Sequence, residues 1–572
     1  MIMVWVVVVS LLACKTPAES PSAKEPVELH FAAINDFHGA LYEVPTKEDP
    51  SMARGGLPWL AGAVEALRAD HPDLILLDGG DLFQGSWPVN ATKGRGSIEA
   101  FNLLGVDAAA LGNHDFDYGP APDGGHELRG ALERAADKAD FAWLAANVSP
   151  ANADAKWLPE AIERYTILEV NGISIGIVGL LTQDTPTTTT PKYVADLVFE
   201  DPVQTVEELL PELEAAGVQV LVVLGHLTGQ CPPTSYTNPG DPCLPGDELG
   251  ALLTGLDTGT IDVLIAGHQH TLFAHRHEDT FLLENRSKGH LLGRLDLVVG
   301  PDGIDYEKST LHQPWEILHR AVDPGCSGGE YPLEPLEVGG RMVTPSSEAL
   351  DLVRRLEEES GSLCEKVGCA SKSLGRSRQA ESEVGDLVAD SMLATFADAE
   401  IAIQNSGGLR ADIPAGDILR DHLHGVMPFD NKLFLVEMTG AKLDLLFQLG
   451  SSGAHGILQV SGAEYHFDPQ GTEGTDLDKD GEVAVWERRR LCGVTVNGKP
   501  IEPDKTYKVV TTDFLLAGGD HLDLAFGDVK TKTEGPLLRD AIVSYVQTQS
   551  ACLGSDEKAP SSRIKTGSCP VP

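Results

Sequence analysis

Short apolar runs alternate with longer stretches of mixed polar and apolar residues through the first half of the chain. Helical spacing in the longer stretches is typical of layers in which helices cover a mainly parallel sheet, so we predict an α/β domain over residues 27–320. Six runs have the length of buried strands: Leu29–Ile34, Leu74–Leu77, Ala108–Leu111, Ile173–Leu180, Val218–Leu224 and Ile261–Ala266.

The pattern changes after this region. Residues 323–345 are rich in Pro and Gly, which favours a connection between domains. A helix start follows at residues 345–348, and the next residues place apolar side chains near helical spacing. We therefore expect a connection and helix over residues 321–362, a second domain over 363–550, and a tail over 551–572.

Composition and charge limit the classes of function. The chain has 572 residues, with 43 Lys and Arg against 86 Asp and Glu, for a net charge of −43. Its 42% apolar and 23% charged residues are ordinary for globular proteins, which excludes global disorder and fibrous repeats. Because the negative field repels phosphates and anionic lipids, we expect no nucleic-acid polymer as partner, and any phosphate site must be local and cation-assisted.

The first residues are typical of an export signal. Residues 1–13 are uncharged and apolar, but shorter than the roughly 20 residues that span a bilayer. The run ends at Cys14 in a sequence that resembles the bacterial lipoprotein box; an ordinary secretory signal is the alternative. We expect a lipoprotein-type signal over 1–14, a flexible tether over 15–26, and a location outside the cytoplasm, in the periplasm or at the cell surface, with membrane contact only through a lipid anchor at Cys14.

Nine cysteines are present, and eight remain when Cys14 is set aside. An even number in an exported chain favours four disulfides, for which 105 pairings exist. Short loops favour three pairs and leave a fourth: Cys231–Cys243, Cys364–Cys369, Cys552–Cys569 and Cys326–Cys492.

Five of the predicted strands run into residues that ligate metals. Open α/β sheets bind ligands at the carboxyl ends of their strands, so we expect these turns to converge on one site. Each motif alone is more often an ordinary turn, but the series favours a pair of Zn²⁺ or Mn²⁺ ions, a device for hydrolysing phosphate esters. The residues are Asp36 and His38, Asp81, Asn113 with His114, His226, and His268 with His270.

These motifs resemble those of the calcineurin-like metallophosphoesterases, and residues 27–550 are similar to the secreted 5′-nucleotidase family, which includes periplasmic UDP-sugar hydrolases and ecto-5′-nucleotidases. The resemblance implies an α/β/β/α sandwich followed by an α+β nucleotide-binding domain. It implies one ion on Asp36, His38, Asp81 and His270, and another on Asp81, Asn113, His226 and His268. Some members carry Gln or Asn in place of His270, so the metal preference can differ.

The resemblance also implies that His114 stabilises the transition state or protonates the leaving oxygen, with Asp117 orienting its ring. An imidazole can donate a proton near neutral pH, and a carboxylate fixes its tautomer. The alternative is a structural His–Asp pair that caps a helix. Because the motifs contain no Ser or Cys nucleophile, the attacking group would be a metal-activated water.

For the second domain, the resemblance implies a substrate site. Aromatic faces stack on bases and guanidinium groups match phosphate oxygens, although an isolated Phe is more often a core residue and Arg376 could take the place of Arg378. The implied roles are base stacking for Phe429 and Phe514, ribose binding for Asp520, sugar or base contacts for Asn405 and Asn431, and phosphate binding for Arg378 and Arg410.

Residues 476–487 match the twelve-position calcium loop D-x-D-x-D-G-x5-E. The candidate ligands are Asp476, Asp478, Asp480, Glu482 and Glu487. The flanks do not predict two helices, so this would be an isolated structural Ca²⁺ loop; the alternative is an acidic surface turn.

Together these features predict an extracytoplasmic binuclear hydrolase that releases phosphate from nucleoside 5′-monophosphates, with the substrate bridging two domains that rotate about their connection. UDP-sugars, nucleotide diphosphates and 2′,3′-cyclic nucleotides are alternative substrates on the same scaffold. A surface protein that binds nucleotides without catalysis is the alternative class.

Overall fold

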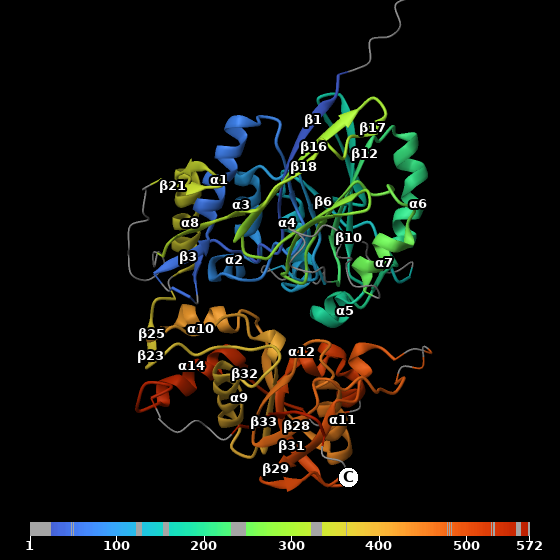
Figure 1. Cartoon of the computed structure of the whole chain (residues 1–572). Helices are drawn as coiled ribbons and strands as arrows, with labels where there is room; N and C mark the ends of the chain where they lie inside the picture. Colours follow the sequence, from blue (N-terminus) through green and yellow to red (C-terminus); the bar gives the residue numbers. More distant parts are fainter. Residues whose placement is uncertain are drawn as a thin grey trace, which may run out of the picture.

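The structure is a computed structural model in which two domains lie one above the other (Figure 1). It describes residues 25–46, 48, 49, 51–121, 128–152, 159–229, 247–321, 335–361, 363–477, 479, 481, 483–527, 529, 532–555 and 562–569. Among the described residues, none of the helices is both long and apolar enough to cross a membrane.

Two sheets stacked face to face form the N-terminal domain. The first sheet has the order β17-β16-β1-β4-β5-β6-β8, with β18 and β19 also paired to β16. Its strands are β1 (Val27–Ile34), β4 (Ile75–Asp78), β5 (Ala108–Ala110), β6 (Ala142–Leu144), β8 (Ile162–Glu163), β16 (Leu291–Gly300), β17 (Gly303–Ile304), β18 (Thr310–Leu311) and β19 (Trp315–Glu316).

The second sheet has the order β14-β15-β13-β12-β10-β9. Its strands are β9 (Tyr165–Val170), β10 (Ile173–Leu181), β12 (Val220–His226), β13 (Val263–Ala266), β14 (Leu272–His277) and β15 (Thr280–Asn285). Smaller pairings lie outside the two sheets: β2 (Glu43–Pro45), β3 (Met52–Gly55) and β20 (Leu318–Arg320); β7 (Val148–Pro150) with β11 (Leu197–Phe199); and β21 (Leu336–Val338) with β22 (Arg341–Val343).

Alternation along β1 explains the layers. Leu29, Phe31 and Ala33 point into the apolar core between the two sheets, where they meet side chains of β10 and β12. Ala32 and Ile34 point to the other face, where the core is closed by helices. The predicted α/β/β/α sandwich is confirmed.

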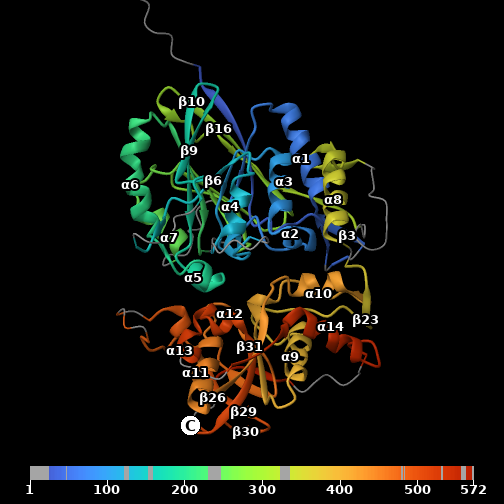
Figure 2. The same ribbon diagram turned by 180° about the vertical axis from the view of Figure 1, so that it is seen from behind.

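Helices cover both outer faces (Figure 2). On the nine-stranded sheet these include α1 (Leu57–Asp70), α2 (Trp87–Ala91), α3 (Arg95–Leu104) and α4 (Gly130–Ala136). On the six-stranded sheet α6 (Pro202–Ala215) and α7 (Glu248–Gly255) supply the apolar contacts. Short segments complete the domain: α5 (Thr185–Thr188), η1 (Asn113–Phe116) and η2 (Pro191–Tyr193).

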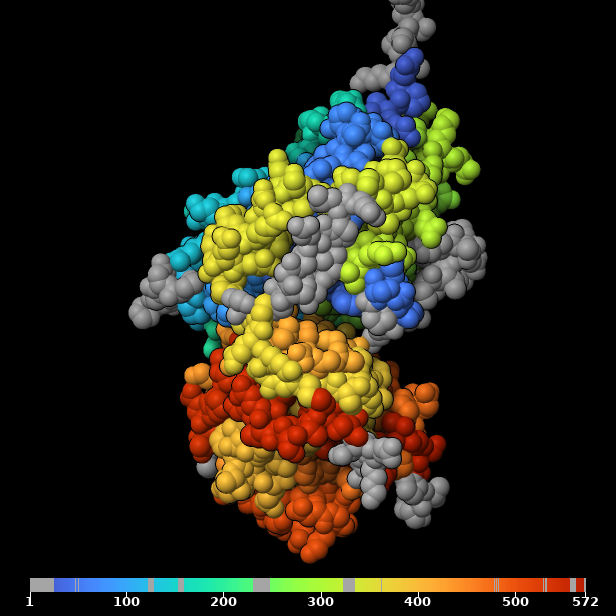
Figure 3. Space-filling model, turned by 90° about the vertical axis from the view of Figure 1, so that its left-hand side faces the viewer, coloured from blue at the N-terminus to red at the C-terminus, as the bar shows by residue number. Residues whose placement is uncertain are grey.

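The helix predicted after the Pro- and Gly-rich stretch is α8 (Ser347–Ser360). Leu352, Val353 and Leu356 are buried in the same core as α1 and α3, so α8 belongs to the N-terminal domain. Figure 3 shows α8, in yellow, lying along the side of this domain above the junction. Trp87 on α2 donates its indole N–H to the carbonyl oxygen of Ser360 at 3.1 Å, which fixes the end of α8 just before the chain enters the second domain.

A five-stranded sheet forms the centre of the C-terminal domain, in the order β27-β24-β31-β26-β32. One face packs on α9 (Glu383–Thr395), α10 (Arg420–Val426) and α14 (Leu538–Thr548). The other face packs on α11 (Gly440–Gly450), α12 (Asp513–Leu516), α13 (Asp523–Phe526) and a four-stranded sheet.

The strands of these sheets are β24 (Ile401–Asn405), β26 (Lys432–Thr439), β27 (Leu458–Ser461), β31 (Thr506–Thr512) and β32 (Lys532–Leu537), then β28 (Ala463–Phe467), β29 (Leu491–Val496), β30 (Lys499–Pro500) and β33 (Ile564–Thr566). β23 (Lys366–Ala370) pairs separately with β25 (Gly416–Leu419), and η3 (Ser406–Gly408), η4 (Val485–Glu487) and η5 (Gly519–His521) are short turns.

The disulfides correct the pairing expected from short loops. Cys369 bonds Cys552, and Cys492 bonds Cys569, across 183 and 77 residues of sequence. The predicted pairs Cys364–Cys369, Cys552–Cys569 and Cys326–Cys492 are therefore wrong, because the fold brings distant cysteines within bonding distance. Cys364 is also disulfide-bonded. The pair Cys231–Cys243 lies outside the described residues.

Candidate metal centre and nucleotide site

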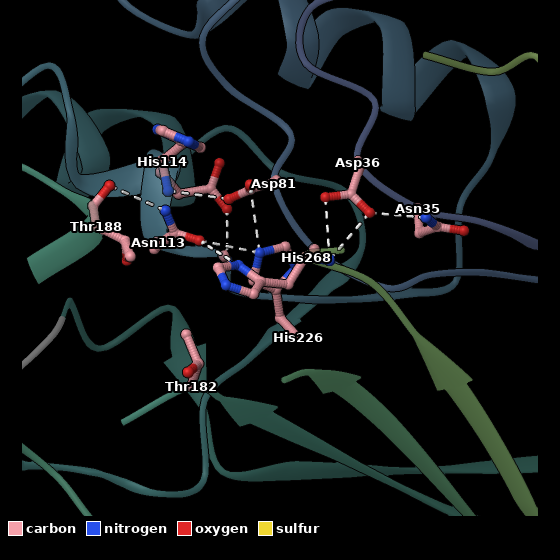
Figure 4. A network of polar contacts seen from close by, with 12 residues as sticks. Asn35, Asp36, Asp81, Asn113, His114, Thr182, Thr188, His226 and His268 are labelled. Carbon is pink, nitrogen blue, oxygen red and sulfur yellow. Dashed lines mark hydrogen bonds and ion pairs between the residues drawn. The ribbon is translucent and has the colours of Figure 1, made fainter. Parts of the chain in front are cut away.

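Five strand ends deliver the predicted ligands to one place between the two sheets. β1, β4 and β5 are parallel neighbours in one sheet, and β12 and β13 are parallel neighbours in the other, so their carboxyl ends lie at a common edge. Figure 4 shows the side chains of Asp81, Asn113, His226 and His268 converging there, with Asp36 on the far side of His268.

One group of ligand atoms comes from Asp36, His38 and His270. The Nε2 atom of His270 lies 3.1 Å from Oδ1 of Asp36 and 3.1 Å from Nε2 of His38. One ligand atom from each of the three residues lies within 4.8 Å of the others, a spacing that suits a shared metal ion.

A second group surrounds Asp81. Its Oδ2 atom lies 3.3 Å from Nε2 of His226 and 3.6 Å from Nε2 of His38. The Oδ1 atom of Asn113 lies 3.1 Å from Nε2 of His226 and 3.0 Å from Nδ1 of His268. Asp81 therefore touches both groups, which is where a bridging carboxylate belongs.

The backbone at these positions is strained. Asp36, His38, Asp81, His268 and His270 all have positive φ, between 49° and 81°. Such conformations cost of order 1–3 kcal/mol each in non-glycine residues and persist where the surrounding structure enforces them, typically at functional sites. Neighbouring glycines allow the close approach, since a Cβ on Gly112 would lie 2.1 Å from Oδ1 of Asp81.

Burial and charge set the protonation of the ligands. Burial alone would raise the pKa of Asp36, but the charge of His270 and a hydrogen bond with it lower the pKa to about 2. Burial and the charge of His226 lower the pKa of His268 to about 3. A carboxylate and a neutral imidazole are the forms that bind metal, so the donor set fits divalent ions.

His114 stands beside this group and is held by a chain of hydrogen bonds. Its Nδ1 atom lies 2.7 Å from Oδ2 of Asp117, and Oγ1 of Thr189 donates to Oδ1 of the same carboxylate at 2.7 Å. The backbone N–H of His114 donates to Oδ1 of Asp81 at 2.9 Å. This arrangement leaves Nε2 of His114 available for a substrate oxygen.

The C-terminal domain reaches the metal centre through Arg410. Its Nη2 atom lies 3.4 Å from Nε2 of His38, and its guanidinium carbon lies 6.0 Å from the centre of the Phe429 ring. The Phe429 ring in turn lies 5.8 Å from the ring of His114. Two of the predicted substrate residues thus lie against the metal centre.

The other predicted substrate residues lie at one edge of the C-terminal sheet. The Nδ2 atom of Asn405 donates to Oδ2 of Asp520 at 2.7 Å, and Asp520 has a positive φ of 57°. The ring of Phe514 packs against Gly519, where a Cβ would lie 2.4 Å from it. Arg378 flanks Gly407, as Asn405 does. Asn431 is half-buried directly before β26.

Family models match both halves of the chain. Residues 29–272 match the model for calcineurin-like phosphoesterases, and residues 365–526 match the model for the 5′-nucleotidase C-terminal domain. The two matches contain the metal cluster and the predicted substrate residues, respectively. The chain belongs to the 5′-nucleotidase family. It is accordingly a metal-dependent phosphoester hydrolase.

Two curated relatives extend over most of the chain. A cell wall protein of Listeria monocytogenes, Lmo0130, is 27% identical over 95% of this chain and 70% of its own length. A 5′-nucleotidase of Rattus norvegicus is 27% identical over 92% of this chain and 89% of its own length. Two further curated relatives are longer, and the chain spans about two fifths of their length.

A solved structure shares the fold. The crystal structure of a 5′-nucleotidase precursor from Thermus thermophilus has a TM-score of 0.71 and 23% sequence identity, covering 95% of this chain and 100% of that chain. This likeness supports the two-domain architecture of the family.

Asn35 is a functional candidate that the motifs did not single out. Its Nδ2 atom donates to Oδ2 of Asp36 at 2.7 Å, and its Oδ1 atom accepts from the backbone N–H of Asn285 at 2.7 Å. Asn35 therefore orients the Asp36 carboxylate from outside the ligand shell. Its position directly before Asp36 was the available sequence signal.

Lys288 was also missed. Burial and the charges of Arg410 and Arg376 lower the pKa of Lys288 to about 8, which places three cations close together. Among the described residues, no carboxylate forms an ion pair with Lys288. Lys288 belongs to the N-terminal domain and follows β15 without a motif, so only the fold reveals its closeness to the second domain.

The calcium loop is described in part. Oδ1 of Asp476 accepts from the backbone N–H of Lys479 at 2.6 Å, and Oε2 of Glu487 accepts from that of Ala484 at 2.8 Å. Gly481 has a φ of 100°, as the sixth position of such a loop requires. Asp478, Asp480 and Glu482 lie outside the described residues.

Proposed function

We propose that this chain is an extracytoplasmic, binuclear 5′-nucleotidase that converts nucleoside 5′-monophosphates to nucleoside and phosphate. The observation that carries the proposal is Asp81, whose Oδ2 atom lies within 3.6 Å of the nearest imidazole nitrogen in each of two ligand groups. Zn²⁺ or Mn²⁺ suits the mixture of carboxylate, imidazole and amide ligands. Such ions supply Lewis acidity toward the phosphoester and lower the pKa of a water molecule.

One ion would be held by Asp36, His38, Asp81 and His270, and the other by Asp81, Asn113, His226 and His268. In this proposal His114 protonates the leaving oxygen or stabilises its charge. The contact between Nδ1 and Asp117 supports this role, because it directs Nε2 away from the carboxylate.

The second domain, over residues 363–550, would recognise the nucleoside. Phe429 precedes β26 and Phe514 follows β31, and these two strands pair with Leu433 opposite Thr512. Both rings therefore come from the same sheet edge, which supports a base clamp. Asp520 would bind the ribose, Asn405 and Asn431 the sugar or base, and Arg378 and Arg410 the phosphate.

The contact of Arg410 with His38 supports a substrate that bridges the domains, with rotation about the connection for entry and release. The same pocket could accept nucleotide diphosphates or UDP-sugars; the cations Lys288 and Arg376 beside Arg410 favour this second candidate, because they offer charge for a further phosphate.

We also propose that residues 476–487 bind Ca²⁺ as a structural ion. Support comes from Glu487, which is 1% exposed although it is a carboxylate, and from the stacking of its neighbour Trp486 on His521 with ring centres 4.9 Å apart. His521 follows Asp520, so an ordered loop would steady the ribose contact.

An extracytoplasmic location agrees with the two described disulfides and with a relative that is a cell wall protein. A lipid anchor at Cys14 remains part of the proposal.

The deciding experiment measures phosphate release by the full chain with Mn²⁺ or Zn²⁺ on AMP, ADP, UDP-glucose, 2′,3′-cyclic AMP and a non-nucleotide ester. We expect AMP to be hydrolysed with the highest kcat/KM, and His114→Ala to lower kcat by about 10²–10⁴-fold. Equal rates on every ester would contradict nucleoside recognition, and no hydrolysis by a metal-loaded chain would favour a non-catalytic binding protein.

A further inference from the structure

A second group of metal-ligating side chains lies at the opposite end of β1 from the centre described above. One ligand atom from each of Glu28, His30 and Asp296 lies within 4.8 Å of the others. Nδ1 of His30 is 2.8 Å from Oδ1 of Asp296, and Nε2 of His312 is 2.5 Å from Oδ2 of the same carboxylate. The His312 imidazole therefore contacts the same carboxylate as His30, beside the group of three.

Strand register explains this meeting. β1 and β16 are antiparallel, with His30 directly opposite Asp296. Glu28 lies two residues before His30 and shares its face of the sheet. On the other side of β16, β18 pairs Thr310 with Asp296, and His312 follows two residues later. Three adjacent strands thus supply the four side chains from a rigid surface.

The group is separate from the phosphoesterase centre. His30 precedes Asp36 by six residues along a mainly extended backbone, which corresponds to about 20 Å. In Figure 1 this end of β1 and β16 points away from the C-terminal domain. The two groups share no ligand.

The two neighbouring carboxylates, Glu28 and Asp296, favour a cation at this point. Among the described residues, neither Glu28 nor Asp296 forms an ion pair with Lys or Arg, although their carboxylate oxygens lie within 4.8 Å of each other. Two adjacent carboxylates repel unless a positive charge lies between them.

Two neighbouring side chains, Arg294 and His71, contact rings in this region. The guanidinium of Arg294 lies 4.9 Å from the centre of the Trp315 ring, which it covers. The ring of His71, at the end of α1, lies against His30 with centres 3.8 Å apart.

We propose that Glu28, His30, Asp296 and His312 form a further divalent metal site, apart from the binuclear centre and the calcium loop and selective for Zn²⁺-like borderline ions. Imidazole and carboxylate in equal number suit Zn²⁺, whereas Ca²⁺ and Mg²⁺ prefer oxygen ligands alone. The ion would tie β18 and β16 to β1 and would neutralise the two carboxylates. Its role is structural, because the ion would join neighbouring paired strands of one sheet.

The test measures zinc bound per chain by equilibrium dialysis and mass spectrometry at buffered free Zn²⁺, using the full-length protein. The variant is His312→Ala, because His312 is partly exposed and its loss should not disturb the core. His466→Ala, in the C-terminal domain, is the matched control. We expect the Kd of the most weakly bound Zn²⁺ ion to be at least about tenfold higher in His312→Ala than in the wild type. The double variant His30→Ala/His312→Ala should bind one Zn²⁺ ion fewer than the wild type.

A second measurement covers the case in which the double variant does not fold. Added Zn²⁺ should raise the Tm of wild type and His466→Ala more than that of His312→Ala, while AMP hydrolysis by His312→Ala stays at the wild-type rate. Identical zinc titrations and identical Tm shifts for wild type and His312→Ala would overturn the proposal. Because the readout is a difference between variants, it is independent of whether the 5′-nucleotidase proposal holds.

Discussion

The metal centre and the nucleoside side of the site differ in how completely the protein itself fixes them. Asp36 and His226 are 0% exposed and each contacts another ligand directly. Phe429, Asn431 and Phe514 are only half-buried; Phe429 and Asn431 lie on a loop and Phe514 in the short helix α12, at one sheet edge. Under the proposed function, the chemistry would be organised in advance within one domain, while selectivity would depend on how the second domain meets the substrate.

This difference predicts that substitutions in the metal centre lower kcat on every ester, whereas substitutions on the nucleoside side change KM for nucleotides alone. Arg410 is the exception, because it belongs to the second domain and yet lies 3.4 Å from the imidazole of His38, a predicted metal ligand.

The largest effect is expected for Asp81→Asn. The amide keeps the shape of the carboxylate but loses the negative charge that both ligand groups share, so it cannot balance two cations. We expect kcat to fall on AMP and on a non-nucleotide ester alike, and by more than in His114→Ala. Phosphate release and metal content by mass spectrometry check this; a variant with near wild-type kcat would contradict the bridging role.

Asn35→Ala tests a residue that contacts the predicted metal ligand Asp36 without being a ligand itself. Loss of the amide that orients Asp36 should weaken metal affinity by about 10–100-fold, with activity restored at high metal concentration. Asn171→Ala removes an amide from a turn elsewhere in the N-terminal domain and is the control. Metal titrations of activity measure the effect, and equal titration midpoints for both variants would exclude the positioning role of Asn35.

Phe514→Leu tests the nucleoside side of the site. Loss of one stacking face costs about 1–3 kcal/mol, so KM for AMP should rise by about 5- to 150-fold while kcat/KM for a non-nucleotide ester stays unchanged. Phe434→Leu, on the strand paired with β31, is the matched control. If both esters respond equally, Phe514 supports the fold and does not stack on the base.

The smallest effect concerns stability and pH. Burial raises the pKa of Asp262 from 3.8 to about 7, so the folded protein retains a proton that the unfolded chain releases. Stability from this group therefore falls as pH rises from about 4 to about 7. Asp262→Asn cannot ionise, and its Tm should exceed that of wild type at pH 8 and equal it near pH 4.

Asp386 provides the counterpart in the C-terminal domain. Burial raises its pKa to about 7, and Nη1 of Arg563 at 3.6 Å opposes that shift. Asp386→Asn should raise Tm at pH 8 as Asp262→Asn does, because both carboxyls have a pKa raised to about 7 in the folded protein, the attraction to Arg563 included. Calorimetry at the two pH values compares them; a Tm gap independent of pH in either variant would refute the linkage for that residue.

Local patterns predicted the fold and the clustering of the metal centre well. Each ligand motif follows a buried strand directly, as His226 does at the end of β12, so strand order alone brings the motifs together. The pairing of His114 with Asp117 follows from their spacing of three residues. Where a strand begins was less accurate: the run predicted from Val218 starts at Val220.

Contacts between distant segments could not be predicted. The partners of Cys369 and Cys492 depend on where the last residues pack, and loop length carried no information about that. Lys288 reaches its neighbours only because the second domain lies against the loop after β15. The assignment of α8 to the first core depends in the same way on tertiary packing.

The two described disulfides determine what happens when the C-terminal tail is cleaved by a protease. Because Cys552 and Cys569 are each bonded to a different distant cysteine, a single proteolytic cut between them releases nothing under oxidising conditions. The severed end stays attached to β29 through Cys492. Electrophoresis would show an intact chain without reductant and a shortened one with it, so nicked protein would escape detection wherever reductant is omitted.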